Sequence, residues 1–396
     1  YFKTAWWNSR TDTHAIGLPL VFLNGLFHVV FAGTGRYSLH LFADIIASRL
    51  PVVFIGSFTP VLIFLFARRF VSISVAFVAA VSYALNPISI ALDRWVLHDS
   101  FLTLFSFLAV TSYLSTYKLK KFSFLPGIWL ALAFLTKPHG LIPLVSWLTL
   151  LFLDRSAQST RLFVRNLISF LAAVLLLWPQ SWIRPLISIP EYIIQQATLT
   201  RVGDPIPNFY LGKPTLYPDA TYYLFQIATR TPEIIINFFL VAIFIFLLKR
   251  NYLRSKYFLA IAIYLIFFFL VISLTPQKGG VRFALPLLPW VYIAAAWAFS
   301  QLTRYLKANL FILFSTIYIL LSLYPLTYHP NFYLYYNAFI GGPQNAFKYD
   351  LVGLCFGTKP ALEFLDRARV PGSVAVIGCA DTASYHTGRS LTKDLT

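Results

Sequence analysis

Long apolar runs separated by short charged turns dominate the chain. Most of these runs are close to the ~20 residues that an α-helix needs to cross a bilayer, and a few are shorter. The sequence predicts about ten helices at 50–67, 71–92, 101–117, 122–136, 140–153, 166–183, 234–248, 257–276, 283–301 and 308–328. Proline within some of these runs is compatible with helices in a membrane bundle, where neighbouring helices satisfy the freed backbone groups.

The composition supports an all-α polytopic membrane protein. Hydrophobic residues make up 58% of the 396 residues, aromatic residues 18% and charged residues only 12%. A soluble globular domain of this length does not have such a composition. The chain contains no Met, so we expect that it begins inside a longer protein.

The basic residues are distributed by membrane side. With Asp154 as the only acid among them, fourteen cations fall in alternate short loops: Arg68, Arg69, Lys118, Lys120, Lys121, Arg155, Arg161, Arg165, Lys249, Arg250, Arg254, Lys256, Arg304 and Lys307. Because loops rich in Lys and Arg stay in the cytoplasm, these loops are predicted to face inward. The net charge of +18 is then a topology signal, and no nucleic-acid partner is expected.

This orientation also divides the chain into three regions. Residues 1–43 form an outer loop in which 17–32 is expected to lie along the membrane surface, since a further span there would reverse the charge rule. Residues 44–328 form the helical bundle, with a long outer loop at 180–232. Residues 329–396 form an outer C-terminal region in which a helix at 359–369 and a strand at 373–377 predict a small α/β unit.

The candidate chemistry collects on the predicted outer face. Two cations, Lys278 and Arg282, lie in a Gly- and Pro-rich stretch at 275–290 between two apolar runs. An ionisable group at a membrane boundary is a candidate functional residue, although such cations also extend to the lipid headgroups without any further role. Lys137, in Thr-Lys-Pro-His, is a weaker candidate at another outer helix end.

Further charged residues lie on the same side. Asp12 and His14 precede the surface helix, and Arg49 begins the first clear span. Arg94 and Asp99 belong to a seven-residue loop that contains two acids, an Arg and a His. Each has an alternative without a functional role. Asp12 could be a helix N-cap in a polar loop, Arg49 could be an interfacial cation, and the loop with Arg94 and Asp99 could simply be solvated.

A carboxylate beside cations at the outer leaflet suits transfer of a group from a lipid phosphate. The acid takes a proton from an acceptor hydroxyl, while the cations hold the phosphate and stabilise its charge as it leaves. No metal-binding spacing is present and no Gly-rich nucleotide motif follows a strand, so neither a metal nor a nucleotide cofactor is expected.

In these residues the chain resembles the GT-C membrane glycosyltransferases, in particular the family-39-like group of protein O-mannosyltransferases and the aminoarabinose lipid A transferase. Residues 13–19, Thr-His-Ala-Ile-Gly-Leu-Pro, are similar to a His-Pro-Pro-Leu segment of the first outer loop. The Arg-Leu-Pro of 49–51 resembles an Arg-x-Pro helix start, and Arg68-Arg69 falls where the family turns inside.

The resemblance continues in the same order along the chain. Arg94 and Asp99 resemble an Arg…Asp pair, and Lys278…Arg282 with Leu-Pro-Leu-Leu-Pro resembles the Lys…Arg-Tyr-x-x-Pro region on the phosphate side, with Phe283 for Tyr. Residues 335–342, Tyr-Tyr-Asn-Ala-Phe-Ile-Gly-Gly, resemble a Tyr-Tyr-Asn…Gly-Gly segment.

The resemblance implies an inverting transferase that takes a sugar from a polyprenyl or dolichyl phosphate on the extracytoplasmic side of the cell membrane. Its base lies upstream of the His-Pro-Pro-Leu segment, but here nothing acidic precedes Asp12. Asp12 matches a second acid of the mannosyltransferases, so the first helix and the base are expected before residue 1, giving about eleven spans in all. Arg49, Lys278 and Arg282 would hold the phosphate, and Asp12 and Asp99 would shape the sugar and acceptor site.

Other functions remain open at this stage. A polysaccharide polymerase or ligase with lipid-diphosphate donors would share the topology. Its preference for a diphosphate over a monophosphate donor would distinguish it from the glycosyltransferase described above. A transporter or flippase of lipid-linked sugars would be expected to carry repeated halves and charges within its spans, which the sequence does not show. The sugar, the acceptor (protein, lipid or glycan) and the pairing of Cys355 with Cys379 stay open, and a non-catalytic scaffold is the remaining class.

Overall fold

The computed structural model describes most of the bundle. The described residues are 17–31, 41–121, 123–178, 182, 187, 189–194, 208–249, 251, 254–276, 278–304, 307–350 and 367. Asp12, His14, both cysteines and the expected α/β unit at 359–377 fall outside these residues, apart from the isolated Arg367.

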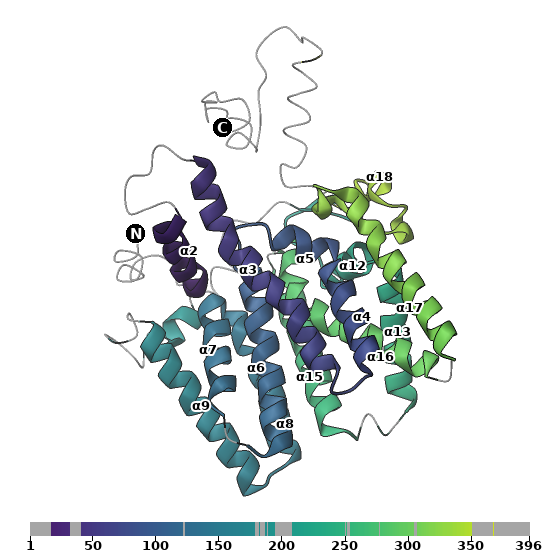
Figure 1. The fold of residues 1–396 in the computed structure, drawn as a ribbon. Coiled ribbons are helices and arrows are strands. Elements are labelled where there is room, and N and C mark those ends of the chain that lie inside the picture. Colours follow the sequence, from purple (N-terminus) through teal and green to yellow (C-terminus); the bar gives the residue numbers. More distant parts are fainter. Residues whose placement is uncertain are drawn as a thin grey trace.

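Helices form almost all of the described structure (Figure 1). The first half contains α2 (Leu18–Phe31), α3 (Leu41–Ala67), α4 (Ile73–Ala84), α5 (Pro87–Leu92), α6 (Asp99–Leu119), α7 (Leu125–Thr136), the 3₁₀ helix η1 (Pro138–Leu141), α8 (Leu144–Leu153) and α9 (Ala157–Leu177). The second half contains β1 (Asn208–Tyr210), β2 (Lys213–Thr215), α12 (Tyr222–Arg230), α13 (Glu233–Leu248), α15 (Lys256–Leu274), η2 (Val281–Leu287), α16 (Leu288–Thr303), α17 (Ala308–Leu323), η3 (Tyr324–Tyr328), η4 (Phe332–Leu334), η5 (Ala338–Ile340) and α18 (Pro343–Ala346).

Each of the ten apolar runs is helical, which confirms a polytopic helical fold. Within the described residues, six helices are long and apolar enough to cross a membrane: Ser48–Ala67, Asp99–Leu119, Ala157–Leu177, Lys256–Leu274, Val281–Thr303 and Asn309–Tyr328. The other four runs contain the shorter apolar helices Ile73–Ala84, Leu125–Thr136, Pro138–Leu153 and Glu233–Leu248. The number of ten spans, and the position of α2 along the membrane surface, therefore stay predictions.

Two helices differ from the runs that predict them. The run at 71–92 is divided into α4 and α5, because Pro87 cannot donate a hydrogen bond and the side chain of Asn86 caps the second helix by accepting from the Ile88 amide at 3.1 Å. Helix α9 begins at Ala157, because the Ser156 side chain caps it. The apolar run starts later, at 166, because the first turns of this helix are polar.

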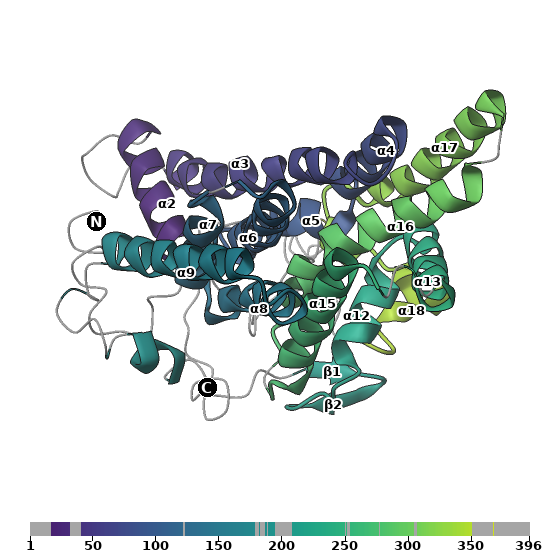
Figure 2. The same ribbon diagram turned by 90° about the horizontal axis from the view of Figure 1, so that it is seen from below.

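Helix α6 lies in the middle of the first group of helices. It packs against α3, α7, α8 and η2. The second group contains α4, α13, α16 and α17, with α15 between α8 and η2 (Figures 1 and 2). Since η2 contacts α5, α6, α12 and α15, it joins the two groups near the start of α6.

The long loop and the C-terminal segment are joined through Arg230 at the end of α12. This side chain is 2% exposed, and it donates to the Tyr333 carbonyl at 2.7 Å and to an oxygen of Asp350 at 3.2 Å. Tyr336 donates to the same Asp350 oxygen at 2.5 Å, and its ring lies 4.2 Å from the guanidinium carbon of Arg230. A buried charge needs such partners, so this network fixes residues 329–350 on α12.

Gly127 allows α7 and α9 to approach each other closely. Its amide donates to the Asn166 side chain at 3.3 Å, and the Ser169 hydroxyl donates to the Phe124 carbonyl at 2.8 Å. A Cβ atom on Gly127 would lie 2.4 Å from the Asn166 carbonyl oxygen. Small residues allow this kind of backbone contact between membrane helices.

Replacement of this glycine should therefore separate the two helices. We expect Gly127→Val to lower the stability of the protein by about 1–3 kcal/mol, because the added methyl groups overlap backbone atoms. Thermal unfolding in lipid nanodiscs, followed by tryptophan fluorescence, measures the effect. Leu125→Val is the control, since Leu125 is 51% exposed in the same helix; equal midpoints for the two variants would contradict the close contact.

Candidate functional site

The site begins at the first turn of α6. Asp99 is the first residue of this helix and its side chain is 1% exposed. A carboxylate is favoured at a helix N-terminus, because the free amides and the helix dipole place partial positive charge there. Burial of a single charge is costly, however, so Asp99 requires a cation nearby.

Lys137 supplies that cation. It directly follows α7, and its ammonium group forms an ion pair with Oδ1 of Asp99. The same ammonium lies 4.4 Å from the centre of the Phe283 ring. The end of α7, the start of α6 and η2 therefore meet around one buried ammonium group.

Arg282 completes a group that we call the Asp99 cluster, defined as Asp99, Lys137, Arg282 and Phe283. The guanidinium carbon of Arg282 lies 5.4 Å from the Phe283 ring, and its charge acts on both Asp99 and Lys137. The cluster thus contains two cations and one acid. It has an excess positive charge beside buried side chains, which favours an anionic ligand.

Two polar atoms of the cluster have no hydrogen-bond partner among the described residues. These are Oδ2 of Asp99 and Nε of Arg282, both of which are buried. An unpaired buried polar atom is costly, typically by about 1–3 kcal/mol. A ligand with both a negative group and a hydroxyl would satisfy the two atoms at once.

Two histidines flank the cluster. Burial and the charges of Lys137 and Arg282 together lower the pKa of His98 to about 4, against the opposing effect of Asp99. His98 is therefore neutral at neutral pH. The His139 ring lies 6.2 Å from the Phe283 ring.

The N-terminal segment joins the described structure beside this cluster. The Gly17 amide donates to the Thr136 carbonyl at 2.9 Å, next to Lys137. A Cβ atom on Gly17 would lie 3.5 Å from Nδ1 of His98, and Gly17 has a φ of +86°. The segment that carries Asp12 and His14 therefore leads to Gly17 at the cluster, although these two residues lie outside the described range.

Lys278 has a different environment from Arg282. Its ammonium group donates to the carbonyls of Ser273 at 2.5 Å, Thr275 at 2.6 Å and Ile272 at 3.3 Å. It thus caps the C-terminus of α15, and burial lowers its pKa to about 8. The next amide, that of Gly279, donates to the Tyr223 hydroxyl at 3.3 Å. These contacts order the loop before Arg282, and the phosphate-binding role of Lys278 stays a prediction.

The remaining predicted cations lie in other surroundings. Arg94 is exposed, donates to the Pro330 carbonyl at 3.3 Å and lies 5.8 Å from the Phe332 ring, so it contacts the C-terminal segment. Arg49 is exposed on α3, and among the described contacts none joins it to the Asp99 cluster. Their roles in ligand binding stay predictions.

The Tyr-Tyr-Asn segment has a clear structural function. The Asn337 side chain donates to the carbonyls of Ala228 at 2.6 Å and Thr231 at 2.9 Å, and its backbone amide donates to the Thr229 carbonyl at 2.8 Å. These bonds satisfy free carbonyls at the end of α12. The segment is thus held against the C-terminal end of α12.

Lys137 is the cluster member that the sequence indicates only as a weaker candidate. The available signal was a lysine between an apolar helix and a Pro, which alone is also typical of an interfacial cation. Its pairing with Asp99 depends on the packing of α6 against α7. Within the described ranges, no group of three His, Cys, Asp or Glu side chains is arranged to hold a metal ion.

The Asp99–Lys137 pair should be sensitive to loss of either partner. We expect Asp99→Asn and Lys137→Met each to destabilise the protein by about 3–5 kcal/mol, because each leaves a buried charge unpaired. The double variant should cost less than the sum of the two. A double-mutant cycle of unfolding free energies measures the coupling, and additive effects would show that the pair is not formed.

Asp93, at the end of α5 and outside the membrane spans, is expected to make the stability of the protein depend on pH. It accepts a hydrogen bond from the Ser100 hydroxyl at 2.5 Å and packs against Gly56 of α3. Burial raises the pKa of Asp93 from 3.8 to about 7. Because the folded chain binds this proton more tightly, the associated stability is full below pH 3.8 and is lost as the pH rises through about 7.

Asp93→Asn should therefore reduce the fall in melting temperature between pH 5 and pH 8. Asp219→Asn is the control, since hydrogen bonds from Thr221 lower the pKa of Asp219 and the effect of that group has the opposite sign. Thermal melts of the three proteins across this range make the comparison. An unchanged pH profile in Asp93→Asn would contradict the raised pKa.

Comparison with known proteins relates this arrangement to characterised families. Residues 35–182 match the family described as dolichyl-phosphate-mannose-protein mannosyltransferase. No curated protein matches the chain significantly. The match includes α3 to α9 and therefore Asp99 and Lys137.

Solved structures with a similar fold extend the comparison to the second half. ArnT from Cupriavidus metallidurans in the apo state has a TM-score of 0.53 at 14% identity, over 75% of this chain and 51% of ArnT. The apo oligosaccharyltransferase of Archaeoglobus fulgidus has a TM-score of 0.54 at 16% identity, over 96% of this chain and 52% of the enzyme.

A third similar structure is AglB from Archaeoglobus fulgidus in complex with an inhibitory peptide and a dolichol-phosphate, with a TM-score of 0.51 at 14% identity, over 95% of this chain and 56% of AglB. The chain spans about half the length of these proteins. The chain is therefore a multi-pass membrane protein with the GT-C fold, and its residues 35–182 are similar to the family described as dolichyl-phosphate-mannose-protein mannosyltransferase.

Proposed function

We propose that the protein is an inverting glycosyltransferase that moves a sugar from a polyprenyl-phosphate donor to an acceptor hydroxyl on the extracytoplasmic side. The observation that carries this proposal is the buried Asp99 cluster, with two cations and one acid on a GT-C fold. The bound dolichol-phosphate of the similar AglB structure supports a donor of this chemical class.

Lys137 and Arg282 are the proposed phosphate ligands. Lys137 is held by Asp99 and by the Phe283 ring, so its ammonium is already ordered before the donor binds. Arg282 has an unpartnered buried Nε and is suited to bidentate contact with phosphate oxygens. As the sugar departs, the phosphate gains negative charge, and these two cations stabilise it.

Asp99 has two proposed roles, one for each oxygen. Oδ1 positions Lys137, while Oδ2 has no partner and is available to a hydroxyl of the sugar or the acceptor. A carboxylate paired with a lysine is a weak base, so the proton acceptor is expected in the N-terminal loop, upstream of or at Asp12. His14 is assigned to the same loop as a binding residue.

The other predicted residues receive peripheral roles. Lys278 supports the loop that presents Arg282 and would lie beside the phosphate only after release from the α15 carbonyls. Arg49 and Arg94 are proposed contacts for the donor headgroup at the membrane surface. The charge distribution of the loops supports an extracytoplasmic site, since the Asp99 end of α6 is opposite the strongly basic loops.

The phosphate ligands can be tested in the full-length protein with labelled sugar on a polyprenyl-phosphate donor. We expect Arg282→Ala and Lys137→Gln to reduce kcat/KM by about 10²–10³-fold, because each removes a cation that binds the developing charge. Lys307→Gln is the control, as this exposed cation belongs to a loop of the opposite predicted face. Unchanged turnover in Arg282→Ala would contradict its assigned role.

The same assay separates the two donor classes. Transfer from a lipid monophosphate but not from a lipid diphosphate would support the proposal, whereas the reverse preference would support a polymerase or ligase. Measurement of the anomeric configuration of the product distinguishes inversion from retention. The acceptor can be a protein, lipid or glycan hydroxyl, and product analysis identifies its class.

A further inference from the structure

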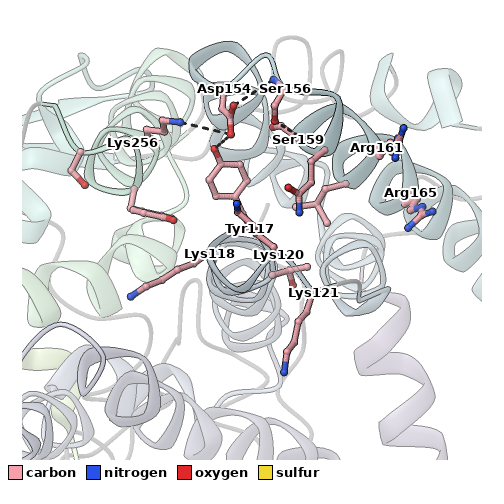
Figure 3. Close-up of a pocket in the computed structure, with 15 residues that line it drawn as sticks. Tyr117, Lys118, Lys120, Lys121, Asp154, Ser156, Ser159, Arg161, Arg165 and Lys256 are labelled. Carbon is pink, nitrogen blue, oxygen red and sulfur yellow. Dashed lines mark hydrogen bonds and ion pairs between the residues drawn. The ribbon is translucent and has the colours of Figure 1, made fainter.

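A second charged site lies at the opposite end of α6 from Asp99. The helix has 21 residues and a length of about 30 Å, so its two ends are a bilayer thickness apart. At its C-terminal end the structure contains a cavity of about 830 Å³. The end of α6, the α8–α9 connection and the start of α15 form its walls (Figure 3).

The cavity is lined by an excess of positive charge. Six cations line it: Lys118, Lys120, Lys121, Arg161, Arg165 and Lys256. Among the described residues of the lining, the one acid is Asp154, which lies between Lys256 on one side and Arg161 and Arg165 on the other in Figure 3. At neutral pH these described residues therefore carry five more positive than negative groups.

Asp154 is fully engaged by the walls of the cavity. It accepts hydrogen bonds from the Tyr117 hydroxyl and from the Ser156 amide at 3.4 Å, and Lys256 lies 3.7 Å away. The hydrogen bond from Tyr117 lowers the pKa of this carboxyl below its ordinary value. Asp154 therefore holds three wall segments together, namely the end of α6, the α8–α9 connection and the start of α15.

The N-terminus of α9 adds neutral donors to this charge. Ser156 caps the helix and its hydroxyl accepts from the Ser159 amide at 3.2 Å. The first free amides of a 21-residue helix, together with its dipole, form a ready site for an anion. This feature alone also occurs at many helices that bind nothing.

Ser159 provides the independent observation. Its side chain lines the cavity and is 2% exposed, yet the hydroxyl has no hydrogen-bond partner among the described residues. Buried hydroxyls nearly always have a partner. An unpaired hydroxyl at a helix N-terminus beside Arg161 indicates a ligand that accepts hydrogen bonds.

We propose that this cavity binds a phosphate group. The combination of Arg side chains, helix amides and a serine hydroxyl is the donor set that recognises phosphate. The site is at the ends of three apolar helices, and Tyr117 and Tyr257, whose rings are 5.9 Å apart, form part of its lining as tyrosines do at a membrane interface. This position fits the headgroup of an anionic lipid, while a soluble phosphate offers the same chemistry.

Basic loops at the inner membrane face are common, and they attract anions without a specific site. The test must therefore distinguish binding in the cavity from this general attraction. The cations Lys249 and Lys307 have the same predicted side and are exposed but do not line the cavity. They supply a matched control for charge. Ser159→Ala supplies the complementary test, since it changes no charge at all.

The binding experiment uses the purified full chain in two arms. In the first, native mass spectrometry measures retention of phosphatidylglycerol against phosphatidylcholine from mixed micelles. In the second, thermal shift with inorganic phosphate and with glycerol 3-phosphate measures binding of soluble anions. Retention of phosphatidylglycerol identifies a lipid headgroup, whereas a response to the soluble anions alone identifies a soluble ligand.

The variants decide whether the cavity is the site. We expect Arg161→Gln combined with Arg165→Gln to weaken binding by at least about tenfold, and Ser159→Ala to weaken it several-fold, with unchanged binding in Lys249→Gln combined with Lys307→Gln. Tryptophan fluorescence melts confirm that each variant is folded. Equal loss in the control pair, or full binding in both cavity variants, would overturn the proposal, as would the absence of binding in both arms.

Discussion

The buried ion pair between Asp99 and Lys137 constrains the arrangement of the whole first half of the bundle. In an apolar interior a lone carboxylate or ammonium is far less stable than in water, so neither residue can occupy its position without the other. Asp99 begins α6 and Lys137 ends α7, and their pairing fixes the relative height of these two helices. Phe283 of η2 covers the ammonium group and thereby couples the second half of the chain to the same point.

The part of the fold that could be predicted depends on which side chains and backbone groups the bilayer can accommodate. A helix in a bilayer must be apolar along its length, so the helical state of the ten apolar runs could be predicted from the sequence. The alternation of the loops between the two sides of the membrane stays a prediction. The break between α4 and α5 could also be predicted in part, because Pro87 marks it. The polar start of α9 could not, since its first turns contain charged residues that read as a loop and only the Ser156 cap indicates a helix.

The site was predictable to a lesser degree. Asp99 and Arg282 are candidates from the sequence alone, because a charge next to an apolar run is costly and is often functional. Lys137 and Lys278 have the same appearance in the sequence, namely a lysine at a helix end, yet one faces a carboxylate and the other three backbone carbonyls. This difference arises from contacts between distant segments, as Asp99 is 38 residues from Lys137. Local pattern therefore identifies charged helix ends but does not tell which of them form the site.

The two ends of α6 use positive charge in different ways. At the Asp99 end, Lys137 is buried and requires Asp99 as its partner, so the position of its ammonium group is fixed before any ligand binds. At the Lys120 end, the described cations of the cavity lining are exposed to water, and one of them, Lys256, lies 3.7 Å from Asp154. Burial increases the strength of each interaction through the lower dielectric constant, whereas exposure allows screening by salt. A ligand at the first end is therefore selected by precise placement of its charge, and a ligand at the second end by charge and hydrogen-bonding capacity, which is the property expected of contact with a lipid headgroup rather than of catalysis.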